Sequence, residues 1–574
     1  MRGGMIWCCQ PVDEETARRL SGSLGVSLPL ARLLVRRGYE EEETARRFLS
    51  PHPSQLRDPY LMADMKKAVA RLGRAISEKE KVFIFGDYDV DGVTSITILS
   101  ALLDAAGVPY RAYQPNRLKE GYGLSREGVD RALEYGASLL FALDCGTEAG
   151  EEIAYARSRG LDVIVIDHHT QRGPLPDAAA ILNPNRADCP YPFKGLAAVG
   201  VVFKFLHGGL AEWSVPVDWE RLYQLAALGT VADVAPLVDE NRVLVAAGLH
   251  FLESRPDPPL RALLEVSGFT SGRLTAGQLA FQIAPRLNAA GRMGRAELGR
   301  QLLAARDRGE MRNLAEQLNR LNDERRSLQA AILDEAGEKI EAEREKYLGS
   351  VIVVEGEGWN KGIVGIVAAK LQERYYRPVV VIALEGERGT GSARGIPGFN
   401  LFEAVSRCAE YLTAFGGHQA AAGIRIDRER IDDFRKALDR VAGVMLGKES
   451  PVPELEIDAE IELEEATIEL AGELDRLEPF GHGNPRPVFC SVTKSMAGSP
   501  SVMGKKNNHL KIRLLGEGGT WECVGWEMAP RVSDLDSGPI DIAYQIRTDT
   551  FRSRPRVQLV LKDFRQSMPV SEFQ

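Results

Sequence analysis

The sequence predicts an α/β protein in which a parallel-sheet domain, a long connecting helix, a second and smaller α/β domain and a C-terminal all-β domain follow one another. From Lys81 onward, short apolar β-rich runs alternate with helical stretches of roughly a dozen residues, which is typical of a parallel sheet. Residues 300–346 are rich in Glu, Arg, Leu and Ala and contain no proline, which indicates one long helix or two. After residue 453 the chain alternates in short strands, as in a small barrel.

A chain of 574 residues exceeds what one hydrophobic core usually organises, so several domains are expected. Changes in composition and pattern along the chain place their boundaries. We expect an N-terminal helical segment at 1–78, the parallel-sheet domain at 79–295, the connecting helix at 296–347, the second α/β domain at 348–447 and the all-β domain at 454–574.

The same alternation predicts the individual elements. In the first α/β domain we expect strands at 82–85, 108–113, 139–143 and 161–166, with helices between them such as 93–106 and 148–159. In the second, a helix at 363–375 separates strands at 351–354 and 379–384, and a further helix is expected at 399–412. In the C-terminal domain the expected strands are 510–514, 521–526, 540–546 and 557–561.

Composition narrows the class of protein. Apolar residues make up 44% and charged residues 27%, as in ordinary globular proteins, and no apolar run approaches the roughly 20 residues that cross a bilayer. The N-terminus lacks the pattern of a signal peptide, and the seven cysteines include no C-x-x-C pair, so a cytoplasmic protein is expected. The net charge of −9 does not exclude nucleic acid, because the carboxylates of a metal site contribute to it.

Residues capable of chemistry follow the predicted strands of the first domain. In a parallel sheet the carboxyl ends of the strands meet at one edge, where ligands bind. The residues expected at this edge are Asp87, Asp89, Asp91, the stretch 115–117, Asp144, Asp167, His168 and His169, with a further acid, Asp233, after a helical stretch.

This mixture of carboxylates and imidazoles suits Mn²⁺ or Mg²⁺, and two such ions can hydrolyse a phosphodiester. Each part alone also fits an ordinary structural role. Asp and Gly are common turn residues, one buried histidine is usual, and the spacing from Asp87 to Gly92 matches a calcium loop except that position 12 is Ile98. Their conjunction at four strand ends, in a chain with eight histidines, favours a metal site.

The order of these motifs resembles the DHH phosphoesterase superfamily. Further stretches are similar to its RecJ branch and the DHHA1 domain of that branch, and 477–485 resembles the start of the branch's C-terminal OB-fold. The resemblance covers roughly residues 80–565. The stretches that carry it beyond the strand ends are Ala284–Arg292, 359–365, 391–394 and 416–418.

The resemblance implies roles for particular residues. Two divalent cations, Mn²⁺ or Mg²⁺, are expected on Asp89, Asp91, Asp144, His168 and Asp233, with Asp144 between them. Asp87, Asp167 and His169 are expected beside the ions, Asp167 orienting an imidazole and His169 contacting the scissile phosphate. The 5′-terminal phosphate and the DNA strand are assigned to Arg117, Tyr122, Arg286, Asn288, Arg292, Ser392, Arg394, Gly416, Gly417 and His418.

For three of these groups an ordinary structural role is an alternative to DNA binding. The stretch 391–395 is also typical of a loop between a strand and a helix. Gly416 and Gly417 are also typical of a helix C-cap after the helix expected at 399–412. The arginines of 286–300 also fit a solvated helix face.

The function that the resemblance implies is metal-dependent 5′→3′ degradation of single-stranded DNA to mononucleotides, in DNA repair and recombination. The alternative is a DHH phosphodiesterase for short oligonucleotides or cyclic dinucleotides, which the additional all-β domain disfavours. A non-catalytic scaffold is disfavoured because none of the expected ligands is missing. The resemblance also suggests a helicase and a single-strand-binding protein as partners. A monomer that does not act at a membrane is expected.

Overall fold

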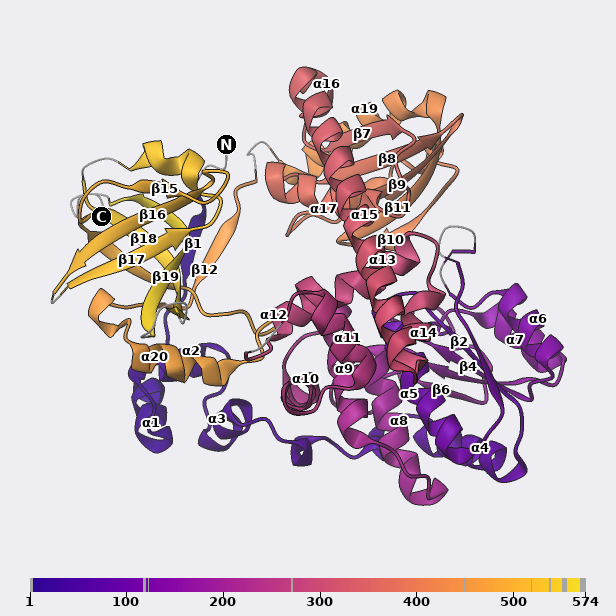
Figure 1. Ribbon diagram of the computed structural model, residues 1–574. Helices are drawn as coiled ribbons and strands as arrows, with labels where there is room; N and C mark the ends of the chain where they lie inside the picture. Colours follow the sequence, from indigo (N-terminus) through magenta and orange to yellow (C-terminus); the bar gives the residue numbers. More distant parts are fainter. Residues whose placement is uncertain are drawn as a thin grey trace. The chain divides into compact units, whose positions relative to one another are not determined.

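The structure is a computed structural model, and it describes residues 4–116, 120–121, 123–269, 272–447, 451–517, 519–535, 538–549 and 555–567. The chain divides into two compact units, which are described separately (Figure 1). One unit contains 52–451 together with 481–484, and the other contains 1–51, 452–480 and 485–574. Within the described residues, no helix combines the length and the apolar character needed to cross a membrane.

The first sheet of the larger unit has five parallel strands in the order β3-β2-β4-β5-β6. Its strands are β2 (Val82–Gly86), β3 (Tyr110–Tyr113), β4 (Leu139–Leu143), β5 (Asp162–Ile166) and β6 (Ala180–Leu182). The four predicted strands and the parallel sheet are confirmed. The three-residue strand β6 was not predicted, because so short a run has no recognisable pattern.

Helices cover both faces of this sheet, which explains why its strands are apolar throughout. Phe83 and Phe85 point to the face that carries α6 (Arg126–Tyr135) and α7 (Gly150–Ser158), whereas Ile84 points to the opposite face. The helices on that opposite face are α4 (Met65–Glu78), α5 (Val90–Ala106) and α8 (Ala198–Trp213). Helix α9 (Trp219–Ala232) packs on α5 and α8, and α10 (Asp239–Ser254) packs on α9.

A run of helices leads to the second α/β region. It consists of α11 (Pro258–Val266), α12 (Ala276–Gln278), the π-helical turn η3 (Leu279–Ile283), α13 (Ala284–Arg292), α14 (Glu297–Ala304), α15 (Arg308–Ala342) and α16 (Arg344–Tyr347). The predicted connecting helix is α15, which is 35 residues long. Its Leu314 and Leu318 belong to the core of the first sheet, and its Ala336 and Ile340 to a core under the second, so α15 ties the two regions together.

The second sheet has the order β10-β11-β9-β8-β7. Its elements are β7 (Ile352–Glu357), α17 (Val364–Tyr375), β8 (Val379–Glu385), β9 (Arg388–Arg394), α18 (Leu401–Ser406), η4 (Ala409–Tyr411), β10 (Ala414–His418), β11 (Ala421–Asp427), η5 (Arg428–Arg430) and α19 (Ile431–Leu446). The predicted strands at 351–354 and 379–384 and the helix between them are confirmed. Helices α15 and α17 pack on one face of this sheet, and α18 and α19 on the other.

Three strands of this sheet were not predicted. Two of the ordinary structural roles considered for this region, a loop and a helix C-cap, are wrong. The stretch 391–394 lies within β9 and is not a loop, and 416–418 lies within β10 and is not a helix C-cap. The helix expected at 399–412 is shorter, because α18 ends at Ser406. Glycines are poor strand formers, so these sequences hide strands that form by antiparallel pairing of β9, β10 and β11.

The smaller unit combines both ends of the chain. Its N-terminal elements are β1 (Ile6–Cys9), α1 (Glu14–Leu24), α2 (Leu28–Arg36) and α3 (Glu42–Leu49). Strand β1, which was not predicted, pairs in parallel with β12 (Glu454–Ile457), and Leu30 and Leu34 of α2 share a core with Phe489 and Tyr544. The segment predicted at 1–78 is therefore divided between the two units, since α4, η1 (Pro53–Gln55) and η2 (Pro59–Leu61) belong to the larger one.

The C-terminal part of the smaller unit is a seven-stranded sheet of order β13-β14-β18-β19-β17-β16-β15. The four predicted strands correspond to β16 to β19, and the all-β class is confirmed. The elements are β13 (Ala459–Glu460), η6 (Leu463–Glu465), α20 (Ile468–Leu474), η7 (Asp475–Leu477), β14 (Phe489–Lys494), β15 (Ser501–Met503), β16 (His509–Gly516), β17 (Gly519–Gly525), η8 (Ala529–Asp534), β18 (Ile540–Asp549) and β19 (Arg556–Gln566).

Candidate metal centre

The first predicted motif forms a tight turn between β2 and α5. The Asp87 amide donates to the carbonyl of Leu143 on β4 (3.3 Å), and Asp89 caps α5, its Oδ1 accepting from the Gly92 amide (3.1 Å). A β-carbon on Gly92 would lie 2.4 Å from the carbonyl oxygen of Asp87. Only glycine therefore lets α5 begin against the strand end, which brings the carboxylates of this motif together.

Asp91 lies in the first turn of α5 and is buried. Its Oδ2 accepts from the Ala198 amide (2.8 Å) and its Oδ1 from the Val199 amide (2.7 Å), both at the start of α8. These bonds favour the carboxylate, as does the helix dipole. Burial, together with the charges of Asp233 and Asp89, nevertheless raises the pKa of Asp91 to about 7. A divalent cation bound beside Asp91 would offset this cost and favour the carboxylate form.

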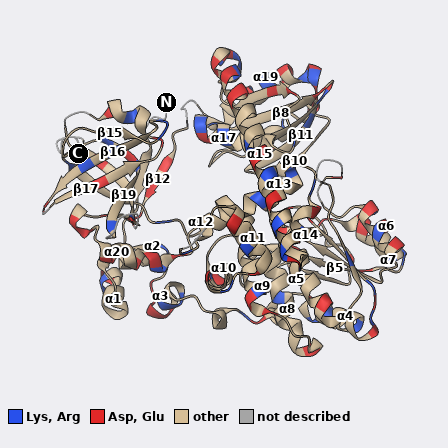
Figure 2. Cartoon of the chain, in the orientation of Figure 1, with Lys and Arg blue, Asp and Glu red and all other residues tan. Residues whose placement is uncertain are grey.

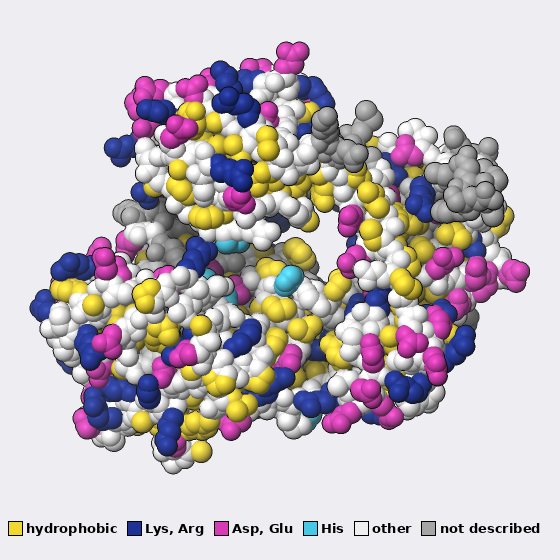
Figure 3. All heavy atoms as spheres, turned by 180° about the vertical axis from the view of Figure 1, so that it is seen from behind, with side chains coloured by type: hydrophobic (Ala, Val, Ile, Leu, Met, Phe, Trp, Pro, Cys, Tyr) yellow, Lys and Arg dark blue, Asp and Glu magenta, His cyan; other side chains and the backbone are white. Residues whose placement is uncertain are grey.

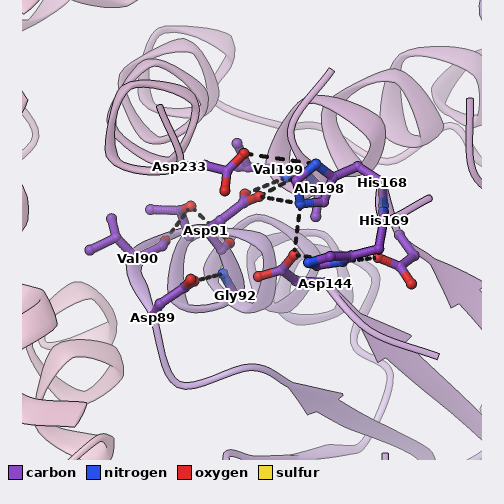
Figure 4. Close-up of polar contacts among 12 residues, drawn as sticks. Asp89, Val90, Asp91, Gly92, Asp144, His168, His169, Ala198, Val199 and Asp233 are labelled. Atoms are coloured by element: carbon purple, nitrogen blue, oxygen red, sulfur yellow. Dashed lines mark hydrogen bonds and ion pairs between the residues drawn. The ribbon is translucent and has the colours of Figure 1, made fainter. Parts of the chain in front are cut away.

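His168 lies at the centre of the site (Figure 4). Its Nε2 is 3.3 Å from Asp144 Oδ1 and 3.9 Å from Asp91 Oδ2, and its Nδ1 is 3.7 Å from Asp233 Oδ2. Nε2 is buried and forms no hydrogen bond within the described part of the chain. Burial also lowers the pKa of His168, which favours the neutral imidazole that a metal requires.

The carboxylates and imidazoles gather into groups with the composition of metal sites. Within each group the potential ligand atoms all lie within 4.8 Å of one another. Oxygen-rich ligands with one or two imidazoles suit Mn²⁺ or Mg²⁺, so the buried Nε2 and the carboxylates fit two divalent ions. The groups are Asp87, Asp89 and Asp144; Asp91, His168 and Asp233; and Asp144, His168 and His169.

Asp167 and His169 form an ion pair at the edge of this site. Asp167 Oδ1 is 2.7 Å from His169 Nδ1 and accepts from the amides of His168 (2.8 Å) and His169 (3.2 Å), while Oδ2 accepts from the Thr147 amide (3.0 Å). Although burial opposes it, these bonds lower the pKa of Asp167. Burial also opposes charge on His169, but the bond to Asp167 and its charge raise the pKa of His169 to about 9. The raised pKa favours the protonated, positively charged form of His169.

Two asparagines that sequence reasoning missed hold this histidine pair. Asn183, fully buried just after β6, donates from Nδ2 to the His169 carbonyl (2.8 Å) and to Thr147 Oγ1 (2.9 Å). Asn185 donates to the His168 carbonyl (2.6 Å), and its own amide donates to Asn183 Oδ1 (2.8 Å). Asparagines near prolines normally signal a turn, so only the fold reveals this role.

We expect Asn183→Ala to weaken metal binding by about 10- to 100-fold, the usual cost of losing a residue that orients ligands. The physical reason is that the His168–His169 backbone loses its buried donor. The rise in melting temperature on titration with Mn²⁺ measures the affinity. Asn313→Ala, on the exposed side of α15, is the control. An unchanged Mn²⁺ titration in Asn183→Ala would show that the backbone is held without it.

Metal binding and stability should depend on pH in opposite ways. A carboxyl whose pKa is higher in the folded protein holds its proton more tightly there, so its stabilising contribution is present at low pH and lost as pH rises through that pKa. The pKa of Asp91 and that of Asp233, raised mainly by burial, are both about 7. Between about pH 6 and pH 8 we therefore expect the melting temperature in EDTA to fall and the increment due to Mn²⁺ to grow. Differential scanning fluorimetry measures both, and an increment that is flat with pH would contradict this.

The structure places the three predicted strand-binding residues on α13. Asn288 Oδ1 accepts from the Val90 amide (3.2 Å), and Arg292 donates to the Gly362 carbonyl (3.1 Å). Asn288 thus adjoins the metal-site turn, and Arg292 reaches the loop before α17. Arg286 instead donates to Asn319 of α15 (2.9 Å). Figure 2 shows Lys and Arg gathered around α13 and the adjoining part of α15.

A second group of predicted residues meets on the second sheet. Arg394 donates to Ser392 Oγ (3.2 Å), and both are half-buried beside the first turn of α17. A β-carbon on Gly365, in that turn, would lie 3.0 Å from Ser392 Oγ and 3.2 Å from Arg394 Nη2. A guanidinium, a hydroxyl and a helix N-terminus together suit a phosphate.

Strand pairing places the predicted residues of β10 level with Ser392 and Arg394 on β9. Gly416 pairs with Gly423, which pairs with Ser392, and His418 pairs with Ala421, which pairs with Arg394. Gly417 lies between them on β10, an exposed edge strand. Figure 3 shows histidine side chains in the hollow between the region of the second sheet and that of the first. Arg117 and Tyr122 lie outside the described residues.

Comparison with known proteins shows which families this chain is similar to. Three family models match the chain: the DHH family, N-terminal domain, at 81–230, the DHHA1 domain at 346–443 and the RecJ OB domain at 457–563. The chain is 38% identical to the single-stranded-DNA-specific exonuclease RecJ of Bacillus subtilis, over 99% of this chain and 71% of that protein. It is 34% identical to RecJ of Dickeya dadantii, over 93% of this chain and 96% of that protein.

A crystal structure of RecJ from Thermus thermophilus in complex with Mn²⁺ matches 99% of this chain and 81% of that chain, with a TM-score of 0.85 and 28% identity. The two α/β regions and the carboxylate–histidine site define a protein of the DHH phosphoesterase class. Within that class, the full-length similarity and the C-terminal domain decide the family. The chain belongs to the RecJ family of single-stranded-DNA-specific exonucleases.

Proposed function

We propose that this chain is a single-strand-specific DNA exonuclease that hydrolyses phosphodiester bonds with two divalent cations, Mn²⁺ or Mg²⁺. The observation that carries this proposal is the pair of ligand groups, one around Asp89 and Asp144 and one around Asp91, His168 and Asp233, at one edge of the first sheet. Membership in the RecJ family supports single-stranded DNA as the substrate. Two divalent ions, when bound, activate a water molecule and neutralise charge on the phosphoryl oxygens.

The chain's own residues prepare the site for that chemistry. The α8 amides and the α5 turn hold the Asp91 and Asp89 carboxylates in place before a cation arrives. His169, positively charged because of its bond to Asp167, donates from Nε2 to a non-bridging oxygen of the scissile phosphate. The same bond fixes its ring orientation, so the proton does not have to be repositioned during turnover.

Cleavage from the 5′ end follows if the terminal phosphate is held at Ser392 and Arg394. A terminal phosphate carries more charge than a bridging diester and suits the guanidinium fork better. Anchoring it at a fixed distance from the metal centre releases mononucleotides in the 5′→3′ direction. Arg117 and Tyr122, with Arg286, Asn288, Arg292 and the 416–418 strand, are proposed to guide the strand between the two.

The C-terminal all-β domain and the cellular role complete the proposal. An OB-type domain gives a long strand an additional binding surface, which a dinucleotide does not need. This favours long single strands over the short oligonucleotides or cyclic dinucleotides of the alternative function. The enzyme acts in DNA repair and recombination. It works as a monomer, together with a helicase and a single-strand-binding protein.

The test uses an internally labelled single strand with Mn²⁺, carrying either a 5′-phosphate or a 5′-hydroxyl. Mononucleotides released from the 5′ end, faster with the phosphate, are the expected result. No release from this strand, combined with turnover of dinucleotides, would instead establish the small-substrate alternative. An inactive Asp144→Asn variant confirms that the activity belongs to this site.

A further inference from the structure

The turn that carries Asp233 is strained. The Asp233 amide donates to the Gly229 carbonyl at the end of α9 (2.9 Å), and the next residue, Val234, has a φ of 59°. The left-handed conformation is unfavourable for a β-branched residue, and glycine is usual at this position of a helix C-terminus. Val234 is also exposed, so packing of its own side chain does not hold it there. The Ala235 amide, which donates to the Thr230 carbonyl (3.2 Å), helps to hold this conformation, and contacts further along the loop add to it.

Part of that support comes from α10. Asn241 Nδ2 donates to the Pro236 carbonyl (3.1 Å) and to the Gly195 carbonyl (2.6 Å). Gly195 lies three residues before Ala198, whose amide holds Asp91. Asn241 therefore joins the loop after Asp233 to the segment that fixes Asp91.

Further support comes from a distant part of the chain. Residues 481–484 form a tight turn in which the Gly481 and Asn484 backbones bond to each other (3.0 and 3.2 Å). The Leu237 amide donates to the His482 carbonyl (2.7 Å). We call residues 481–484 the tip. They belong to the stretch 477–485, which resembles the start of the C-terminal OB-fold and for which the sequence predicts no contact with the metal site.

The fit between the tip and the loop leaves no room for side chains. A β-carbon on Gly481 would lie 2.7 Å from Leu237 Cδ1, and one on Gly483 would lie 3.0 Å from Pro236 Cβ. Gly483 also has a φ of 72°, which disfavours any other residue. Leu237 is 2% exposed, so it cannot move aside without disturbing the core.

We propose that the tip is a positioning element of the metal centre: it pins the loop 234–237 and thereby holds Asp233 in its ligand position. The proposal deepens the proposed function, on whose metal site it rests. The residues flanking the tip belong to the other compact unit. The chain thus uses four residues from the start of its C-terminal region to support Asp233, the residue that follows α9.

The test compares Gly483→Val and Gly481→Val with the unaltered full-length chain. Each variant should require about 10- to 100-fold more Mn²⁺ for half of the maximal rise in melting temperature, the usual effect of disturbing residues behind a ligand. Binding of a long single strand in EDTA should stay within about twofold, because the tip acts on the metal site and not on the strand. His482→Ala is the matched control, since its carbonyl makes the contact and its side chain is exposed; its Mn²⁺ titration should be unchanged.

Two outcomes overturn the proposal. An unchanged Mn²⁺ titration in both glycine variants, with only the metal-free melting temperature lowered, would make the tip an ordinary packing contact. Lost strand binding with normal Mn²⁺ binding would make it part of the DNA surface. Because the Mn²⁺ titration needs no DNA, it remains decisive even if the unaltered protein fails to degrade single strands, which would refute only the proposed function.

Discussion

Asp144→Asn is expected to reduce mononucleotide release from single-stranded DNA by at least about 10³-fold, more than the 10- to 100-fold typical of residues that only orient a ligand. Asp144 belongs to two of the three ligand groups and lies 3.3 Å from His168 Nε2. Asparagine preserves the shape of the side chain, removes its charge and replaces one accepting oxygen by a donating NH2 group. The Mn²⁺-dependent rise in melting temperature should largely disappear as well.

The same substitution should stabilise the metal-free protein. Burial, followed by the charges of Asp91, Asp89 and Asp87, raises the pKa of Asp144 well above that of an ordinary carboxyl. Its stabilising contribution is therefore lost as pH rises through this raised pKa, and a neutral asparagine does not suffer that loss. In EDTA at mildly alkaline pH, we expect the variant to melt a few degrees higher than the unaltered protein, since about 1 kcal/mol shifts melting by a few degrees.

Glu151→Gln is the matched control for both effects, because it removes one acid from the exposed side of α7. Activity and metal-free melting should be nearly unchanged in this variant. If Asp144→Asn lost activity and was also destabilised in EDTA, its carboxylate would be a structural group and not a cation ligand held under repulsion.

The clustering of the candidate metal ligands could be anticipated from sequence because most of these residues follow buried parallel strands. The four strands are nearly continuous apolar runs, and their order along the chain places Asp144 and the Asp167–His169 triplet at one edge. At this edge of the sheet, the local sequence pattern therefore predicts the correct position of these residues in the fold. The ligand motifs are also local turns with strong residue preferences, such as Gly92 after Asp91.

The parts that escaped prediction depend on contacts between distant residues. Strands β9 and β10 contain Gly391, Gly416 and Gly417, whose intrinsic preference is against strands; antiparallel pairing overrides it. Asn183 acts through hydrogen bonds to residues that precede it by 14 and 36 positions. The tip meets Leu237 across an even longer separation. Local sequence patterns cannot predict contacts between residues that are so far apart in the chain.

A substitution on the second sheet should change which DNA end the enzyme prefers. We expect Arg394→Ala to lower kcat/KM on a 5′-phosphorylated strand by about 10- to 100-fold, the value of a hydrogen-bonded pair of opposite charges. The rate on a 5′-hydroxyl strand should change little. The reason is that the Arg394 guanidinium and Ser392 Oγ lie together against the first turn of α17, where a β-carbon on Gly365 would come within 3.0 Å of Ser392 Oγ. Initial rates on the two strands, for both enzymes, form a cycle that isolates the phosphate–arginine interaction.

Arg388→Ala tests whether charge alone is responsible, because Arg388 lies on the same strand, β9, but is exposed at its other end. It should slow both substrates equally, if at all, since a screened surface charge acts on the strand as a whole. Gly365→Val should act like Arg394→Ala by displacing the Ser392 and Arg394 side chains, without removing any charge. Equal slowing of both DNA ends by Arg394→Ala would place the arginine on the strand backbone, and the 5′-terminal phosphate would then have to be recognised elsewhere on the chain.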